Sequence, residues 1–189
     1  NALNSVIQLF NGIDALRQHV TPDVRMHGII TKGGVAANIV PDEAIADFYF
    51  RASTKERVTE VVEKVKRIAE GAALMTGATL EMERYELPYD DLKTNETLSE
   101  IFNSNLRELG ITDIKEAKVT GGSSDIGNVS HVAPTIHPYI GVTDCPMVGH
   151  SVEMANSTIT SKAHDRLLIA ALAMAYTGHD IIVRNESLR

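Results

Sequence analysis

The stretch RMHGIITKGGVAANIVPDEAIADFYFRA, from Arg25 to Ala52, decides the fold of the amino-terminal part of the chain. Its first segment, VRMHGIIT counted from Val24, is rich in β-branched residues, and its last segment, AIADFYFRA, alternates apolar and polar side chains. Alternation with a period of two is typical of a strand with one buried face, and a glycine pair favours a turn. The two segments are therefore predicted to form a hairpin that buries Ala46, Phe48 and Phe50.

Amphipathic helices are predicted on both sides of this hairpin. Apolar residues recur at three- and four-residue spacing in the amino-terminal segment, which predicts a helix from about Ala2 to about His19. A second helix is predicted from Thr54 to Thr76, ended by Gly77, and ATLEMERYELPY, residues 78–89, reads as a further strand. The order α-β-β-α-β is that of the ferredoxin-like βαββαβ sandwich without its first strand.

The absent first strand makes the chain look incomplete. A sheet edge with unpaired backbone groups invites association with other strands, so another segment or another chain is expected to supply the missing one. We therefore expect the 189 residues to be a fragment of a longer protein.

The pattern changes after residue 90. A third amphipathic helix follows, then KEAKV (115–119) and PTIHPYIGV (134–142) read as strands, and a last helix is predicted from Ser161 to Tyr176, stopped by Gly178. The second half of this last helix, LLIAALAMAY, is apolar all round, which predicts that it is packed on both sides.

Composition excludes several classes of partner. The 18 Lys and Arg against 25 Asp and Glu give a net charge of −7, and the sequence has no basic run, so a nucleic-acid partner is not expected. The single cysteine, Cys145, cannot form an internal disulfide, and no apolar run approaches the roughly 18 residues that cross a bilayer. These features predict a cytoplasmic protein without a membrane partner.

Two polar clusters flanked by glycine stand out in the second half. GHSVEM, residues 149–154, places His150 near Glu153 in a loop before a helix, where metal ligands are often presented, although a lone loop histidine is more often solvated or a helix cap. No HxxH or HExxH spacing assembles a complete site, so further ligands are needed from outside this chain; the other candidates are His131, His137 and His164. TGGSSDIG, residues 120–127, can either hold an anion or cap the short helix that follows.

Asn38 and Arg51 lie on either side of the second hairpin strand. Arginine holds a carboxylate through a fork of two hydrogen bonds, and asparagine adds a neutral donor, so both suit an acidic ligand. The alternative is a turn asparagine and a surface arginine paired with Asp47 or Glu43. The residues alone favour that alternative.

Taken in order, four stretches resemble the aminoacylase and glutamate carboxypeptidase family of dinuclear zinc exopeptidases, in the amidohydrolase branch of p-aminobenzoyl-glutamate hydrolases and Xaa-Arg dipeptidase-like proteins. They are NALNSVIQLFNGIDALRQHV, RMHGIITKGGVAANIVPDEAIADFYFRA, GGSSDIGNVSHVAPTIHPYIGV and GHSVEM. The resemblance implies an α/β protein of two domains: a βαββαβ lid at residues 1–90, lacking its first strand, and the carboxyl-terminal part of a catalytic domain at residues 91–189.

The resemblance also implies the chemistry. Two divalent metal ions, zinc or else manganese or cobalt, are expected, with His150 as one ligand and with the general-base glutamate and most other ligands in the missing amino-terminal part. Asn38 and Arg51 are expected to bind the substrate carboxylate, and Gly122 and Ser123 are expected to line the same substrate-binding pocket. Met154 departs from the family, which often has an aromatic residue there.

These features predict part of a metal-dependent amidohydrolase that cleaves an N-acyl amino acid or a dipeptide with a free carboxylate. A homodimer formed through the lid is expected, and the isolated fragment is expected to be inactive. The alternatives are a non-catalytic ferredoxin-like module for dimerisation or ligand binding, since such folds often serve that role, and a catalytically dead homologue.

Overall fold

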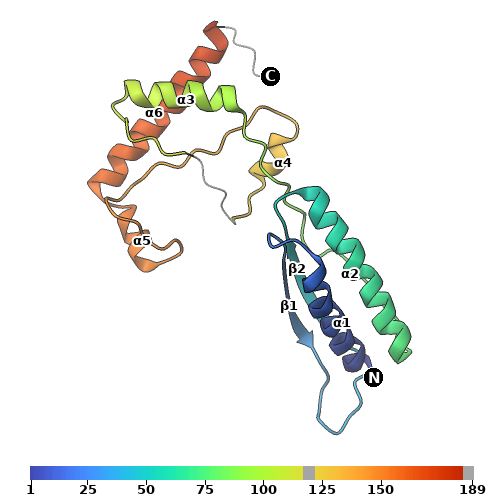
Figure 1. The fold of residues 1–189 in the computed structure, drawn as a ribbon. Helices are drawn as coiled ribbons and strands as arrows, with labels where there is room; N and C mark the ends of the chain where they lie inside the picture. The colour runs from blue at the N-terminus through green and yellow to red at the C-terminus, as the bar shows by residue number, and fades with distance from the viewer. Residues whose placement is uncertain (117–121, 185–189) are drawn as a thin grey trace. The chain divides into compact units, whose positions relative to one another are not determined.

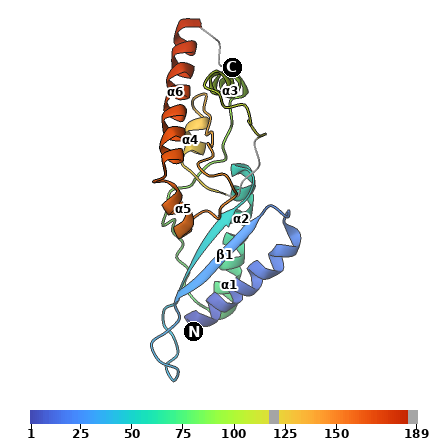
Figure 2. The same ribbon diagram turned by 90° about the vertical axis from the view of Figure 1, so that its left-hand side faces the viewer.

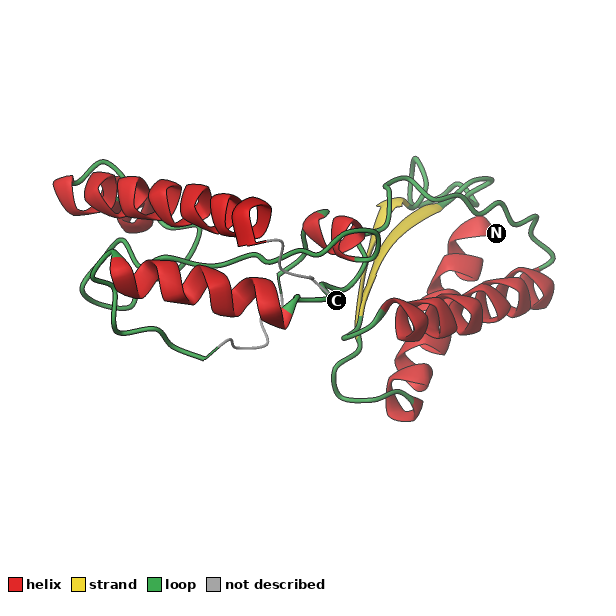
Figure 3. Ribbon diagram, turned by 90° about the horizontal axis from the view of Figure 1, so that it is seen from above, coloured by secondary structure: helices red, strands yellow, loops and turns green. Residues whose placement is uncertain are grey.

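The computed structural model describes residues 1–116 and 122–184, and the chain divides into two compact units, Asn1–Asp91 and Leu92–Arg189 (Figure 1). The described parts form a mixed α/β protein whose one regular sheet lies in the first unit (Figure 3). The elements run in the order α1 Ala2–Leu16, η1 Arg17–His19, β1 Arg25–Lys32, β2 Ile45–Arg51, α2 Lys55–Thr76, α3 Glu96–Glu108, α4 Ile126–Ser130, α5 Val152–Ser157 and α6 Ser161–Arg184.

The predicted hairpin is confirmed. Strands β1 and β2 pair antiparallel, with Arg25 opposite Arg51 and Gly28 opposite Phe48, and the register shifts between Ile30 and Lys32. A side chain at position 28 would overlap the Phe48 ring, so the glycine in MHGII lets this aromatic ring lie flat across the neighbouring strand.

Both predicted helices of the first unit are also confirmed, and their ends are capped as the sequence indicates. The side chain of Asn1 accepts a hydrogen bond from the Asn4 amide, and that of Thr54 accepts one from the Arg57 amide. Helix α2 ends at Gly77, whose φ of 70° is left-handed and suits glycine. The two helices lie on the same side of the hairpin (Figures 1 and 3).

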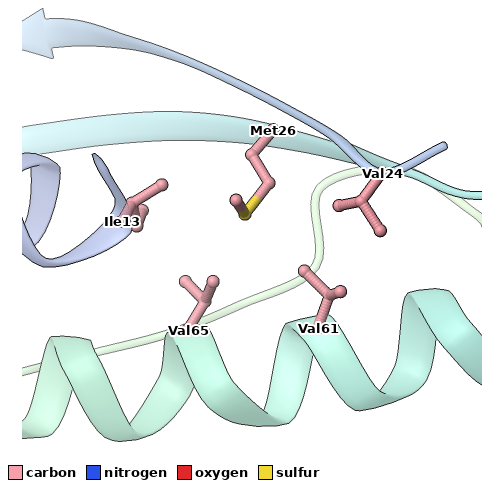
Figure 4. Close-up of a cluster of buried hydrophobic side chains, with 5 residues drawn as sticks. All are labelled: Ile13, Val24, Met26, Val61 and Val65. Atoms are coloured by element: carbon pink, nitrogen blue, oxygen red, sulfur yellow. The ribbon is translucent and has the colours of Figure 1, made fainter. Parts of the chain in front are cut away.

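The core of the first unit lies between the hairpin and these helices. Ile13 of α1, Met26 of β1 and two valines of α2 converge on it (Figure 4), and Val24 closes one end; the valines are Val61 and Val65. Ile13 is 1% exposed. Phe48 and Phe50 pack against the same cluster, as the alternation in β2 predicts.

The further strand predicted at residues 78–89 is wrong. This segment has no ladder with either strand, and it contacts β2 through side chains: the Tyr85 hydroxyl donates to the Phe48 carbonyl at 3.4 Å, and its ring meets Tyr49 edge-on with 5.6 Å between centroids. The backbones of paired strands lie about 4.8 Å apart. The Tyr85 side chain lies between the backbone of residues 78–89 and β2, so the two backbones are too far apart to form a ladder.

The second unit has helices and loops but no named strand among its described residues. A single parallel bridge joins Thr94 to Thr135, so the strand predicted at residues 134–142 is also wrong. The strand predicted at 115–119 falls largely outside the described residues. Extended segments form strands only when a neighbouring backbone accepts their hydrogen bonds, and the described residues of this unit supply one bridge instead of a ladder.

Helix α6 runs at an angle to α3 (Figure 1), and Figure 2 shows α3 nearly end-on beside it. The two helices pack through a small apolar cluster of Phe102, Leu106 and Ala173. The predicted stop at Gly178 is wrong, because α6 continues to Arg184. Contacts on both sides of this glycine hold the helix: the buried Asn105 amide of α3 donates to the Thr177 hydroxyl at 3.2 Å and to the Asp180 carboxylate at 3.1 Å. Tertiary contacts thus outweigh the local cost of glycine in a helix.

The prediction that α6 is packed on both sides is wrong for this chain. Its side away from α3 exposes several large apolar residues, among them Leu168, Leu172 and Ile182. By length and composition alone, residues Ser161–Val183 are also long and apolar enough to cross a membrane, contrary to the expectation from the sequence. One such helix is weak evidence for a membrane span, since the core helix of a soluble protein passes the same test.

We predict that Ile13→Ala destabilises the first unit by about 2–5 kcal/mol, because it removes a buried side chain and leaves a cavity. Urea unfolding measures this loss. The matched control is Ile7→Ala on the same helix, where the side chain is 42% exposed and the loss should be small. Equal losses at the two positions would contradict the assignment of the core.

Candidate functional site

Asn38 lies in the loop that joins the two strands. The residue is exposed in a turn closed by the Ile39 amide, which donates to the Ala36 carbonyl at 3.1 Å. An ion pair between Lys32 and Glu43 closes the base of this loop. The alternative interpretation of the sequence suggested Arg51 as a partner of Glu43, and in the structure Glu43 pairs with Lys32. Asn38 also lines an open hollow with Asn1, Leu3 and Pro41.

Arg51 lies at the opposite end of the hairpin. It is exposed at the end of β2, opposite Arg25 at the start of β1, whereas the Asn38 loop follows the other end of β1. The register from Arg51 to Ile45 spans the whole sheet, about 20 Å at the usual rise of a strand. The structure therefore does not bring Asn38 and Arg51 together within one chain.

The face of the hairpin away from the helices is polar and partly aromatic. His27 lies opposite Tyr49 on this face, and both are exposed. A hydrogen bond to the Glu86 carboxylate, followed by desolvation and a bond with Tyr85, raises the pKa of the Tyr49 hydroxyl above its usual value. Tyr49 is therefore a neutral hydrogen-bond donor at physiological pH.

The glycine-serine cluster divides between the two interpretations of the sequence. The Ser124 hydroxyl accepts a hydrogen bond from the Ile126 amide at 3.3 Å, one residue before the N-cap Asp125 of α4, whose own side chain makes no capping hydrogen bond. Gly122 and Ser123 precede it, are exposed, and are available to a ligand. Gly121 lies outside the described residues.

His150 is exposed and has a left-handed backbone, with φ of 59°. It is the one non-glycine residue with positive φ among the described residues, and this conformation is uncommon for residues other than glycine, although His, Asn and Asp adopt it more often than the rest. Ser151, and not His150, caps α5: its hydroxyl accepts from the Met154 amide at 3.1 Å and donates to the Val148 carbonyl at 2.8 Å. The turn thus presents the imidazole outward.

A complete metal site does not exist within the described parts of this chain. No group of three or more His, Cys, Asp or Glu side chains there can hold an ion. His137 contacts Tyr139 instead, with 5.1 Å between ring centroids. The exposed imidazole of His150 fits the role of a single ligand, and the other donors of a dinuclear site would have to come from elsewhere.

Sequence reasoning missed a polar cluster that ties the segment before β1 to the start of α2. The Asp23 carboxylate accepts a hydrogen bond from the Thr21 hydroxyl, one from the Ser53 amide at 3.0 Å and one from the Ser53 hydroxyl at 2.8 Å. These three hydrogen bonds hold the pKa of Asp23 well below its usual range. The buried Nε of Arg57 lies 3.8 Å from the same carboxylate and has no hydrogen-bond partner among the described residues. The only signal of this cluster in the sequence was the presence of hydroxyl residues near both helix and strand ends.

Comparison with known proteins identifies the class. Residues 1–75 match the peptidase dimerisation domain family. The chain is 34% identical over 188 residues to Xaa-Arg dipeptidase of Mus musculus, covering 97% of this chain and 43% of that protein. It is 33% identical over 191 residues to Xaa-Arg dipeptidase of Homo sapiens, covering 100% and 44%. With one of the subunits of p-aminobenzoyl-glutamate hydrolase of Escherichia coli (strain K12) it shares 25% identity over 236 residues, covering 94% and 48%.

The first unit thus carries a peptidase dimerisation domain. More particularly, the chain is homologous to Xaa-Arg dipeptidase and p-aminobenzoyl-glutamate hydrolase, and it spans less than half the length of these relatives. The family resemblance of the sequence is confirmed. The roles of the individual site residues stay predictions.

We predict that His150→Gly stabilises the second unit by up to about 1 kcal/mol, because glycine adopts a left-handed backbone without steric cost. His150→Ala should show no such gain. Calorimetric melting of the two variants measures the difference. An increase in stability in His150→Gly but not in His150→Ala would mean that histidine is kept at this position despite a conformational cost. A loss of stability in His150→Gly would contradict a strained backbone at this turn.

We predict that Asp23→Asn destabilises the first unit most above pH 4 and that the difference narrows on acidification. The folded pKa of Asp23 is lowered from 3.8, so its contribution is present above that value and is lost as pH falls toward the folded pKa. Urea unfolding at pH 7, 4 and 3 measures the effect. Asp14→Asn, an exposed carboxylate paired with Arg17, is the control and should shift stability little at any pH.

Proposed function

We propose that this chain is part of a metal-dependent amidohydrolase that cleaves an N-acyl amino acid or a dipeptide with a free carboxylate. The observation that carries the proposal is the similarity to Xaa-Arg dipeptidase, which runs through both units over 188 residues. Homology to the p-aminobenzoyl-glutamate hydrolase subunit and to an N-acetyldiaminopimelate deacetylase of Lactiplantibacillus plantarum supports the same reaction type, hydrolysis of an amide beside a carboxylate.

His150 is proposed to serve as one metal ligand. Its imidazole is exposed, and the Gly149–Ser151 turn is fixed by the two hydrogen bonds of Ser151, so the ring can meet an ion without reorganising the backbone. Two divalent ions, zinc or else manganese or cobalt, would polarise the amide and activate a water when bound. The general base and the remaining ligands are proposed to come from polypeptide other than this chain.

The substrate carboxylate is proposed to bind Arg51, with Gly122 and Ser123 lining the same pocket. Arg51 offers a planar fork that matches a carboxylate. Because the length of the sheet, about 20 Å from Arg51 to Ile45, lies between Arg51 and the loop of Asn38, Asn38 is proposed to reach the same carboxylate from a second copy of the chain. The dimerisation domain in the first unit supports such a homodimer.

A second candidate function is a module for dimerisation alone. Residues 1–75 match the dimerisation family, and the first unit closes its own core without contributions from the second. On this hypothesis His150 binds no metal, and the chain contributes only to association between subunits.

We predict that His150→Ala lowers both bound metal and hydrolysis of N-acyl amino acids at least tenfold in the protein expressed from the complete gene that encodes this chain, because a direct metal ligand is lost. Elemental analysis and an activity assay measure the two effects. His179→Ala, an exposed histidine of α6 that is not among the candidate ligands, is the control and should change neither.

Unchanged metal content and turnover in His150→Ala would overturn the role of this residue. Absence of any metal and any hydrolysis in the complete protein, with a dimer still present in sedimentation, would favour the dimerisation module. The 189-residue chain by itself is expected to show no hydrolysis, since it lacks a complete metal site in its described parts.

A further inference from the structure

Residues 78–89 run beside β2 in the same direction as that strand. The Tyr85 hydroxyl donates to the carbonyl of Phe48, in the middle of β2. Six residues further along, the Asp91 carboxylate accepts a hydrogen bond from the Lys55 amide at 3.0 Å, at the start of α2. The segment and β2 therefore advance together, and α2 is the connection that returns the chain between them.

The space between these two segments is about one strand wide. A tyrosine hydroxyl lies roughly 6 Å from its own Cα atom by standard bond lengths, so the 3.4 Å hydrogen bond to Phe48 puts the two backbones on the order of 10 Å apart. Paired strands lie about 4.8 Å apart, and twice this spacing holds one further strand. Two parallel segments joined by a helix, with room for one strand between them, form a split βαβ unit. Its middle strand is absent from the residues that the structure describes.

The edge of β2 that borders this space is suited to pair with a strand. Successive residues of a strand direct their amide and carbonyl groups to opposite edges, and Tyr85 reaches the Phe48 carbonyl from the side of residues 78–89. Ala46 and Phe50 lie two positions away from Phe48, so they direct their backbone groups to the same edge. In the part of the chain that the structure describes, β1 is the only strand paired with β2. This edge is therefore open to a second ladder.

We propose that the space between β2 and residues 78–89 binds one extended strand, supplied by polypeptide of the complete protein outside these 189 residues. The chain spans less than half the length of its relatives, so a protein of their length contains ample polypeptide for this strand. In the βαββαβ order, the middle strand precedes α1, and the crossover through α1 makes it parallel to β1. Since β1 and β2 are antiparallel, the strand runs opposite to β2.

The chemistry of this partner follows from the two faces of the sheet. One face carries Phe48 and packs on the core with α1 and α2, whereas the other carries the exposed Tyr49. The bound strand therefore alternates apolar side chains, directed toward the helices, with polar ones on the side of Tyr49. Its backbone amide takes over the Phe48 carbonyl and displaces the Tyr85 hydroxyl from it.

The test uses the 189-residue chain and a synthetic peptide of about ten residues, the upper length of a common strand, from the part of the complete gene product that precedes α1. NMR-detected hydrogen exchange locates the bound peptide. At saturation, the peptide should slow exchange of the Ala46, Phe48 and Phe50 amides at least about tenfold, because they enter a ladder. A peptide of the same composition in scrambled order is the control and should have no such effect.

Tyr85→Phe tests the displacement of the tyrosine. This variant should bind the peptide about fivefold more tightly, because the strand no longer competes with a hydroxyl whose net hydrogen bond is worth a factor of this size. The matched control is Tyr89→Phe, which removes the hydroxyl of another exposed tyrosine of the same segment and should leave the affinity unchanged. Equal affinities of the two variants would contradict competition at the Phe48 carbonyl.

Three outcomes would overturn the strand site. They are the absence of peptide binding, equal protection by the scrambled peptide, and slowed exchange at the edge of β1 instead of β2. Protection of the same β2 amides without peptide, rising with chain concentration, would show that a second copy fills the space and would reject the proposed occupant. The measurement needs neither metal nor turnover, so its result is independent of the proposed hydrolysis.

Discussion

The burial of Ile13 between the hairpin and α2 is the contact on which the first unit depends. It joins an element that precedes the hairpin to one that follows it, and the valines of α2 and Met26 of β1 complete the cluster. Because both helices pack on the same side of a two-stranded sheet, no described helix of this unit covers the other side, where Tyr85 of the following segment contacts Tyr49. One-sided packing thus explains why charged and aromatic residues of β1 and β2 share an accessible face.

The second unit is organised around a single helix pair. Asn105, buried at the crossing of α3 and α6, bonds to two side chains of α6 and sets the register of the pair. The opposite side of α6 is apolar and exposed, and the extended segments that the structure describes in this unit have one isolated bridge between them. A layer with one covered face is typical of part of a larger α/β arrangement, in keeping with a chain that spans less than half of its relatives.

The candidate site residues differ in the contacts that fix their positions within this chain. His150 is held outward by a local turn, so its presentation depends only on Gly149, Ser151 and the start of α5. The position of Arg51 depends on the pairing of two strands. Asn38 lies beyond the reach of Arg51 in one chain, which makes association between copies part of the proposed chemistry.

The sequence by itself determined the local elements. Helices α1, α2 and α3 follow from apolar residues that recur with a period of 3.6, and strands β1 and β2 follow from a period of two. Asn1, Thr54 and Gly77 cap their helices through contacts with residues only three or four positions away. Only the tertiary structure decided that residues 78–89 and 134–142 are not strands and that α6 passes Gly178, because ladders and helix packing need partners distant in the chain. The tertiary structure also decided that Asn38 lies far from Arg51 and that Arg25 lies opposite Arg51. Both results depend on the register between the two strands, and the pattern of side chains along one strand does not determine that register.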